Sequence, residues 1–206
     1  MRQPRNVFYE VSRYIRYTGP MKRGNPGHGQ LGSAAHAAQR AAALIAVLVV
    51  ETHDDATAQV LTRQLLEDFG EPNPKLDAQD VVALRRAAED VLAVFAAPDM
   101  ASTVAHLNAL LARSATAPRL TAHDGTPWHL HVDPSDNAPW GPWFVASSAM
   151  ALAILASDKQ RPPGGLCASS SCRRPFVDVG KGGGRRYCSP RCATRERVAS
   201  HRRKQG

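Results

Sequence analysis

The hydrophobic pattern in the first part of the chain predicts two helices. Residues 33–52 are almost wholly apolar in their second half, which is typical of a helix buried on all sides. Asp54 or Asp55 can cap a second helix, which should run to about Phe69 and end at Gly70. Both helices are expected to belong to one core.

Three further helices are expected downstream. Apolar residues recur at every third or fourth position over residues 77–97, and Pro98-Asp99 restarts the chain into a helix that ends near Ser114. Residues 144–157 are nearly all apolar and should pack against the earlier helices.

Between the last two of these helices the pattern changes to alternation. Residues 119–123 and 128–132 alternate, and the turn that joins them contains Asp124-Gly125. Asp-Gly between two alternating runs predicts a β-hairpin. The expected fold class is therefore mainly α, a helical domain with one β-hairpin.

The segments on either side of the helical domain differ from it. Residues 1–32, rich in Gly, Pro and Lys toward their end, are expected to be a disordered basic leader. Residues 159–165 contain two prolines and two glycines and are expected to be a linker. The helical domain then covers residues 33–158, and a small second domain covers residues 166–206.

Charge divides the chain in a similar way. Residues 1–30 carry six Lys/Arg and one acid, residues 31–160 eight and fifteen, and residues 161–206 twelve and two. The last block suits a polyanionic partner, because Lys and Arg that neutralise phosphates release counterions. The acidic middle should avoid nucleic acid. No membrane segment is expected, since the longest apolar run, residues 41–50, is too short to span a bilayer.

All four cysteines fall within 26 residues of the basic block, with the spacing C-x4-C-x15-C-x3-C. Two short-spaced pairs can deliver four thiolates tetrahedrally to one structural Zn²⁺, with no open position for catalysis. Two disulfides, redox-active thiols or unpaired cysteines are the alternatives. The clustering favours zinc, and the expected ligands are Cys167, Cys172, Cys188 and Cys192.

The residues around the second cysteine pair suggest how the ligands are held. Residues 176–179 alternate and residues 185–187 return after a glycine-rich turn, which predicts a hairpin between the pairs. Ser189 is a good N-cap and Pro190 suits the first helical position, so Cys192 should lie in the first turn of a helix. The expected arrangement is a small treble-clef-like zinc finger.

The predicted C-terminal helix is strongly basic. Arg191, Arg195 and Arg202 fall near one stripe, and Val198 and Ala199 are expected to dock the helix onto the hairpin. Such a helix can enter a major groove or lie along phosphates, whereas the alternative is a solvated helix that only ends the chain. The candidate nucleic-acid-binding residues are Arg185, Arg186, Arg191, Arg195, Arg197, Arg202, Arg203 and Lys204.

The C-terminal segment contains a recognisable set of short strings around the cysteines. They are Phe176-Val-Asp178, Arg185-Arg-Tyr-Cys188-Ser-Pro, Cys192-Ala-Thr-Arg195, Val198-Ala and His201-Arg-Arg. With these strings the segment resembles the CGNR zinc-finger family of bacterial proteins. The family pattern Cys-Gly-Asn-Arg is here Cys192-Ala193-Thr194-Arg195, so the zinc ligand and the arginine are kept. The resemblance implies a preceding helical ABATE domain of stress-induced transcription regulators, in which the Trp128-His-Leu-His-Val-Asp133 strand has its expected place.

The expected function is that of a zinc-binding, DNA-binding transcription regulator of bacterial type, cytoplasmic and associated with the nucleoid. The resemblance also implies a sensor domain, and with it a small-molecule effector. The alternative is a zinc-stabilised protein–protein interaction module whose basic helix meets an acidic partner. A third hypothesis is a metal-dependent enzyme that uses His129 and His131. No enzyme is expected, because no catalytic motif accompanies them. Trp128, Trp140 and Trp143 are expected to pack in the core rather than to line a ligand pocket.

Overall fold

The computed structural model describes residues 30–71, 73–122, 128–135, 137–180, 182 and 184–205. The expected leader lies outside the described residues up to residue 29, and so does the Asp124-Gly125 turn. The first described helix begins at Gln30, three residues before the expected start of the helical domain.

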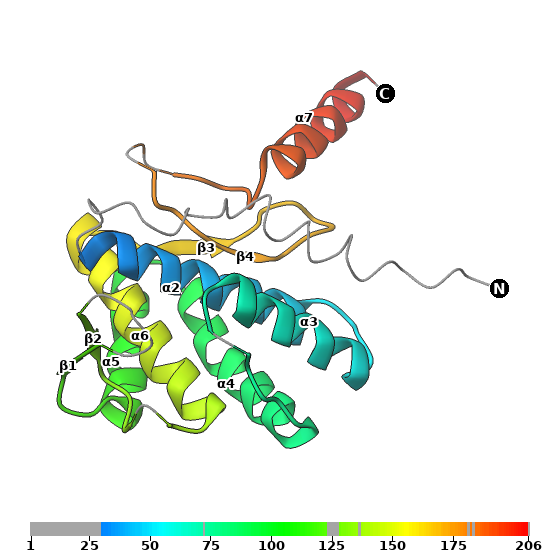
Figure 1. Ribbon diagram of the computed structural model, residues 1–206. Coiled ribbons are helices and arrows are strands. Elements are labelled where there is room, and N and C mark those ends of the chain that lie inside the picture. Colours follow the sequence, from blue (N-terminus) through cyan, green and yellow to red (C-terminus); the bar gives the residue numbers. More distant parts are fainter. Residues whose placement is uncertain are drawn as a thin grey trace.

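The helical domain is built mainly from helices that pack side by side (Figure 1). The segment predicted as one buried helix is an α-helix that continues into a wider π-helical turn. The last helix begins four residues earlier than expected. The helices are α2 (Gln30–Ile45), η1 (Ala46–Val50), α3 (Asp55–Asp68), α4 (Ala78–Ala96), α5 (Met100–Ser114) and α6 (Trp140–Lys159).

Three aspartates begin the middle helices. The Asp54 carboxylate accepts a hydrogen bond from the Thr57 amide at 2.8 Å, and Asp99 accepts one from the Ser102 amide at 2.8 Å. Asp77 forms a reciprocal capping box with the residue three positions on. These bonds satisfy backbone donors that have no partner inside the helix, so the start sites expected from the sequence are confirmed.

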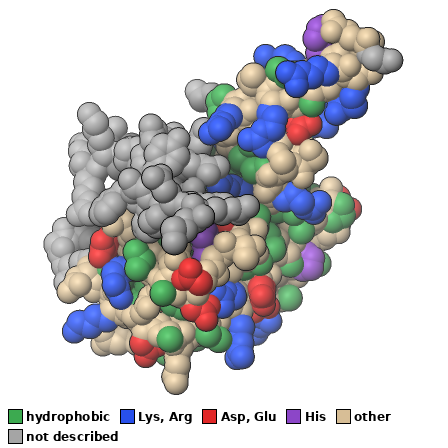
Figure 2. Space-filling view, turned by 90° about the vertical axis from the view of Figure 1, so that its right-hand side faces the viewer, with side chains coloured by type: hydrophobic (Ala, Val, Ile, Leu, Met, Phe, Trp, Pro, Cys, Tyr) green, Lys and Arg blue, Asp and Glu red, His purple; other side chains and the backbone are tan. Residues whose placement is uncertain are grey.

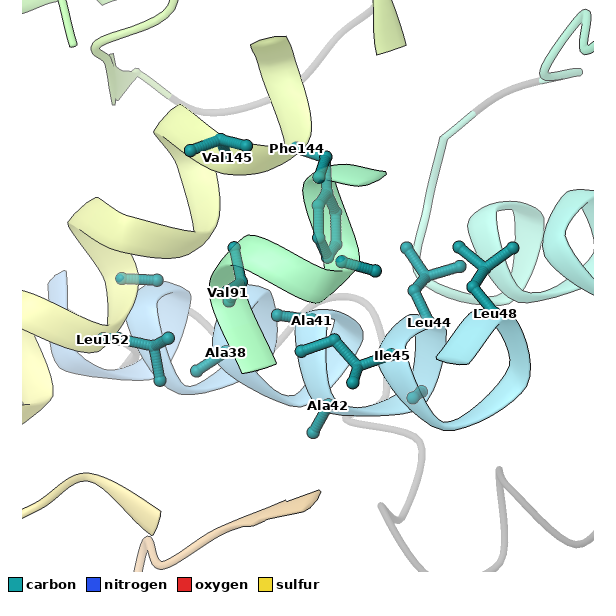
Figure 3. Packing of buried hydrophobic residues seen from close by; sticks show 14 of the residues in the cluster. Ala38, Ala41, Ala42, Leu44, Ile45, Leu48, Val91, Phe144, Val145 and Leu152 are labelled. Carbon is teal, nitrogen blue, oxygen red and sulfur yellow. The ribbon is translucent and has the colours of Figure 1, made fainter. Parts of the chain in front are cut away.

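The core lies where α2 crosses α4 and α6 (Figure 3). Ala38 and Ala41 of α2 are fully buried there, and Leu152 of α6 and Val91 of α4 pack against the same helix. Small side chains on α2 let the neighbouring backbones approach closely, while the larger residues fill the remaining space. This packing accounts for the apolar character of α2.

Within the part of the chain that the structure describes, two helices are long and apolar enough to cross a membrane by length and composition alone. These are residues 33–50, of which 67% are buried in the structure, and α6, of which 56% are buried. Both helices are longer than the apolar run of residues 41–50, on which the expectation of no membrane segment was based. Their burial against α4 and against each other is the observation that accounts for their apolar character.

The predicted hairpin is present in the helical domain. Strands β1 (Arg119–Thr121) and β2 (His129–His131) pair antiparallel, with Leu120 opposite Leu130. These two leucines are 65% and 38% exposed, whereas the flanking polar residues on the other face are partly buried. Trp128, which precedes β2, is 75% exposed, so the expectation that it packs in the core is wrong. The hairpin therefore directs its polar face inward, the reverse of the usual arrangement.

A second hairpin joins the cysteine segment to the helical domain. Strand β3 (Gly164–Leu166) pairs antiparallel with β4 (Pro175–Val177), so residues 164 and 165 belong to a strand rather than to a linker. The expected pairing of residues 176–179 with residues 185–187 is wrong. Strand β3 can pair with β4 because Gly164 has no side chain. A Cβ at residue 164 would come within 2.0 Å of the Phe176 carbonyl oxygen.

The second hairpin packs on the helical core. Val177 is 5% exposed and belongs to the same buried cluster as the helices, and Leu166 packs against that cluster. Asp178 forms an ion pair with Arg161 at 2.5 Å, and its amide donates to the Pro163 carbonyl at 2.8 Å. The cysteine segment thus packs directly on the helical core through β3 and β4.

Candidate metal centre and basic helix

The first cysteine pair lies in the tight connection between β3 and β4. The Cys167 amide donates to the Arg174 carbonyl at 2.9 Å, and the Cys172 amide donates to the Ser169 carbonyl at 3.0 Å. Arg173 adopts a left-handed backbone conformation, with φ of 53°, where the chain turns back into β4. These bonds form a knuckle that directs both sulfur atoms to one side.

The second pair is placed by the start of helix α7 (Pro190–Gln205). The Ser189 hydroxyl accepts a hydrogen bond from the Cys192 amide at 3.2 Å, as the sequence predicted for an N-cap. The Cys188 amide donates to the Cys167 sulfur at 3.4 Å and so ties the two pairs together. Cys192 is buried in the first helical turn, where the helix dipole favours an anionic sulfur.

The four sulfur atoms lie within 4.8 Å of one another. The Cys172 and Cys188 sulfurs are 3.6 Å apart, and those of Cys188 and Cys192 are 3.7 Å apart. Four sulfurs at about 2.3 Å from a tetrahedral zinc would be separated by about 3.8 Å, whereas a disulfide would need about 2.05 Å. The donor set therefore fits one zinc ion and does not fit disulfides.

The thiols also influence one another. The contact between the Cys172 and Cys188 sulfurs lowers the pKa of the Cys172 thiol and raises that of the Cys188 thiol. Burial raises the pKa of Cys167. Since zinc binds thiolates, loading the site releases the remaining thiol protons.

Two polar side chains fix α7 onto the knuckle. The Glu196 carboxylate accepts a hydrogen bond from the Ser169 hydroxyl at 2.8 Å and one from the Ser170 amide at 3.2 Å. Arg195, the residue before Glu196, donates to the Ser171 hydroxyl. The direction of α7 is thus set by the metal ligands and by these side chains.

The predicted docking of Val198 is wrong. Val198 is 45% exposed, because the contacts of Glu196 and Arg195 hold only the first turns of α7 to the knuckle. The rest of the helix projects away from the body (Figure 1). Ala199 is partly buried.

The candidate nucleic-acid-binding residues are all exposed, but they do not share one environment. Arg185 donates to the Tyr187 carbonyl at 2.8 Å and to the Cys188 carbonyl, and its guanidinium lies 5.2 Å from the centre of the Phe176 ring. These contacts give Arg185 a structural role beside the metal centre. The remaining candidates on α7 extend from its first turn to its end, and Arg186 precedes the second cysteine pair.

A cavity of about 480 Å³ is lined by residues of the finger, of α2 and of the η1 end. Arg174, Arg191 and Arg195 line it on the finger side. Glu51 lines the opposite side and forms an ion pair with Arg174, and its other oxygen lies 3.4 Å from Nε2 of His53. The sequence analysis did not predict the ion pair between Glu51 and Arg174. The only sign of it in the sequence is that Glu51 directly follows an apolar run.

The two strand histidines form a second polar cluster, in the helical domain. The Nε2 atoms of His129 and His131 are 2.9 Å apart, and Nδ1 of His131 lies 2.9 Å from the Asp133 carboxylate. Asp133 is 3% exposed and also pairs with Arg119 at 2.7 Å. The structure thus brings together the two residues of the third hypothesis, within a network of hydrogen bonds.

Together the helical core, the four-sulfur centre and the attached basic helix define a zinc-finger protein with a helical companion domain. The comparison with family models gives the same two parts. Residues 50–158 match ABATE, described as "Putative stress-induced transcription regulator", and residues 165–205 match the CGNR zinc finger. Since the ABATE match spans more than half of the chain, the chain belongs to this family. No curated protein matches the chain.

Proposed function

We propose that this protein is a bacterial transcription regulator that contacts duplex DNA through α7. The observation that carries the proposal is the exposed basic surface of that helix (Figure 2). Every Lys and Arg on α7 is exposed, and its one acid, Glu196, accepts hydrogen bonds from the knuckle. A rigid helix of this charge can lie along phosphates or enter a groove.

The geometry narrows the set of expected DNA contacts. Arg191 and Arg195 line the cavity that faces α2, and Arg185 is engaged by backbone carbonyls. The distal part of α7 is farther from these contacts and most accessible to a duplex. The residues proposed to contact phosphate there are Arg197, Arg202, Arg203 and Lys204.

The test is a salt-titrated mobility shift with random duplex DNA. The variant replaces Arg202, Arg203 and Lys204 by Gln, and the matched control replaces the body residues Lys75, Arg86 and Arg113 by Gln. If all three α7 residues contact phosphates, the negative slope of log K against log salt becomes shallower by roughly 3 in the variant. The control keeps the wild-type slope, because its charges lie on the acidic body.

Two results would contradict the proposal. Equal slopes in the variant and the control would show that α7 does not contact DNA. Wild-type protein that binds no duplex at low salt would favour the alternative, a zinc-stabilised protein–protein interaction module with an acidic partner. The proposal includes a cytoplasmic location beside the nucleoid. The match of the helical domain to a family of transcription regulators supports this location.

We also propose that the chain is not an enzyme. The Nε2 atoms of His129 and His131 are hydrogen-bonded to each other, and Nδ1 of His131 contacts Asp133, so these nitrogens are already engaged. The zinc site has four sulfur ligands and no open position. Purified wild-type protein and a His129→Asn variant should therefore show no difference in hydrolysis of generic ester or phosphoester substrates.

A further inference from the structure

The four cysteines of the metal centre differ in their access to solvent. Cys167 and Cys192 are 4% and 5% exposed, whereas Cys172 and Cys188 are partly exposed. Cys172 and Cys188 also line the cavity of about 480 Å³ between the finger and α2, which has the volume of a small-molecule site. Cys192 lines it as well but is buried, and Cys167 does not line it. A small reagent in solution therefore reaches the sulfurs of Cys172 and Cys188 more readily than the other two.

The two accessible sulfurs are also neighbours in space. They are 3.6 Å apart, although the residues lie 16 positions apart in the chain. A disulfide needs about 2.05 Å, so the two sulfurs must approach by about 1.5 Å to be joined. The Cys188 and Cys192 sulfurs are 3.7 Å apart, but Cys192 is buried and the Ser189 hydroxyl holds its amide at the start of α7. Distance and exposure together favour the pair Cys172 and Cys188.

The surroundings of these two sulfurs are basic. Arg191 and Arg195 line the same cavity, and Arg174 does so beside β4. Among the described residues of the lining, Glu51 is the one acid, and it forms an ion pair with Arg174. Positive surroundings and partial exposure are the features that make a thiolate reactive toward oxidants.

We propose that Cys172 and Cys188 form a hydroperoxide-sensitive pair within the zinc centre. The thiolate of either residue attacks one peroxide oxygen, the O–O bond breaks, a sulfenic acid forms, and the other oxygen leaves as hydroxide or alkoxide and is protonated. The second thiolate attacks the sulfenic sulfur, so that the S–S bond forms, the S–O bond breaks and hydroxide leaves to become water. The two sulfurs together lose two electrons, and the hydroperoxide gains them.

The disulfide removes two of the four ligands of the metal centre. Cys167 and Cys192 alone cannot enclose a zinc ion tetrahedrally, so oxidation of the pair releases the metal. The first turn of α7 then loses its attachment through Cys192, while the hydrogen bonds of Glu196 to the knuckle remain. The proposal concerns the metal centre and holds whether or not α7 contacts DNA.

The first test measures zinc release from the zinc-loaded protein during treatment with hydrogen peroxide. A chromogenic chelator reports the released ion, and a thiol reagent counts the thiols that remain. Zinc release is expected to accompany the loss of two thiols per chain, and dithiothreitol with added Zn²⁺ should reverse both changes. Protein kept for the same time without peroxide is the control. Zinc retained at a peroxide concentration that fully oxidises free cysteine in the same solution would overturn the proposal.

Mass spectrometry at low conversion then identifies the pair. N-ethylmaleimide blocks the thiols that are still free, the disulfide is reduced, and iodoacetamide labels the thiols that appear. Trypsin cleaves after Arg186 and Arg191, so Cys188 and Cys192 fall in separate peptides. We expect iodoacetamide on Cys172 and Cys188, and N-ethylmaleimide on the two buried cysteines, which are matched controls within the same molecule.

Other label patterns would refute the assignment. Iodoacetamide on Cys188 and Cys192, or on Cys167 and Cys172, would mean that proximity in the sequence rather than exposure decides the pair. Cys167 and Cys172 share one tryptic peptide, and its fragment spectra distinguish them. Label spread evenly over all four cysteines would show non-selective oxidation and would contradict the proposal as well.

Discussion

Arg174 of the knuckle forms an ion pair with Glu51, the residue at which η1 ends. The two side chains are 16% and 18% exposed, so the pair is mostly shielded from water. Arg174 also accepts a hydrogen bond at its carbonyl from the amide of the zinc ligand Cys167. One residue therefore links the metal centre to the helical core.

Replacement of Glu51 by Gln should weaken this link. The partly buried guanidinium would lose its counter-charge, and we expect the free energy of unfolding to fall by about 1.5–3 kcal/mol. Urea denaturation measures the effect. The control is Asp90→Asn, which breaks the half-exposed pair with Arg113 and should cost no more than about 0.5 kcal/mol. Equal losses in both variants would mean that the Glu51 pair does not stabilise the junction.

The two neighbouring glycines of β3 should respond differently to substitution. Gly164→Ala places a methyl group against the Phe176 carbonyl, and forcing the strands apart should cost about 1–3 kcal/mol. Gly165→Ala meets only the Phe176 ring at 3.8 Å, an ordinary contact, and should change stability by no more than about 0.5 kcal/mol. Thermal unfolding of the pair tests the strand register, which would be incorrect if Gly165→Ala were the more harmful change.

Zinc should be present at one ion per chain in gently purified protein. Cys192→Ser removes a buried ligand and is expected to abolish zinc retention and to lower the melting temperature, because the finger packs on the core through Val177. Elemental analysis and calorimetry measure the two effects. Re-addition of Zn²⁺ to chelator-treated wild-type protein should restore the melting temperature, whereas Mg²⁺ should not. Metal-free protein with wild-type stability would argue against a structural zinc.

The helix caps should confer a pH dependence. Hydrogen bonds from the Thr57 and Ser102 amides lower the pKa of Asp54 and Asp99 below their usual value. A carboxyl whose pKa is lower in the folded state stabilises the fold above its unfolded pKa, near 4, and this contribution is lost as pH falls through the folded pKa. Asp99→Ala should therefore be less stable than wild type at pH 7, and the difference should shrink below about pH 4.

An uncharged cap provides the control for this prediction. Asp99→Asn keeps a side-chain oxygen for the Ser102 amide, so its stability should change less with acid than that of wild type. Melting temperatures at pH 7 and pH 3 compare the three proteins. An Asp99→Ala deficit that persists unchanged at pH 3 would show that the loss is not due to the carboxylate.

Local patterns in the sequence were sufficient to predict the helices, their aspartate caps and the four zinc ligands. The reason is that each of these depends on residues close in the chain: an apolar repeat, a cap three positions ahead of its donor, or two short-spaced cysteine pairs. The Ser189 cap and the placement of Cys192 in the first turn of α7 follow from the same local rules.

Only the tertiary structure decided the contacts between distant segments. The sequence could not show that β4 pairs with β3, because strand pairing depends on which backbone can approach, and the missing Cβ of Gly164 settles it. Nor could it show that Glu51 meets Arg174, or that Arg40, placed in an apolar helix, is buried beside Trp143 and Ser147. Those pairings depend on how α2, α6 and the finger pack together, and packing brings together residues that no spacing rule relates.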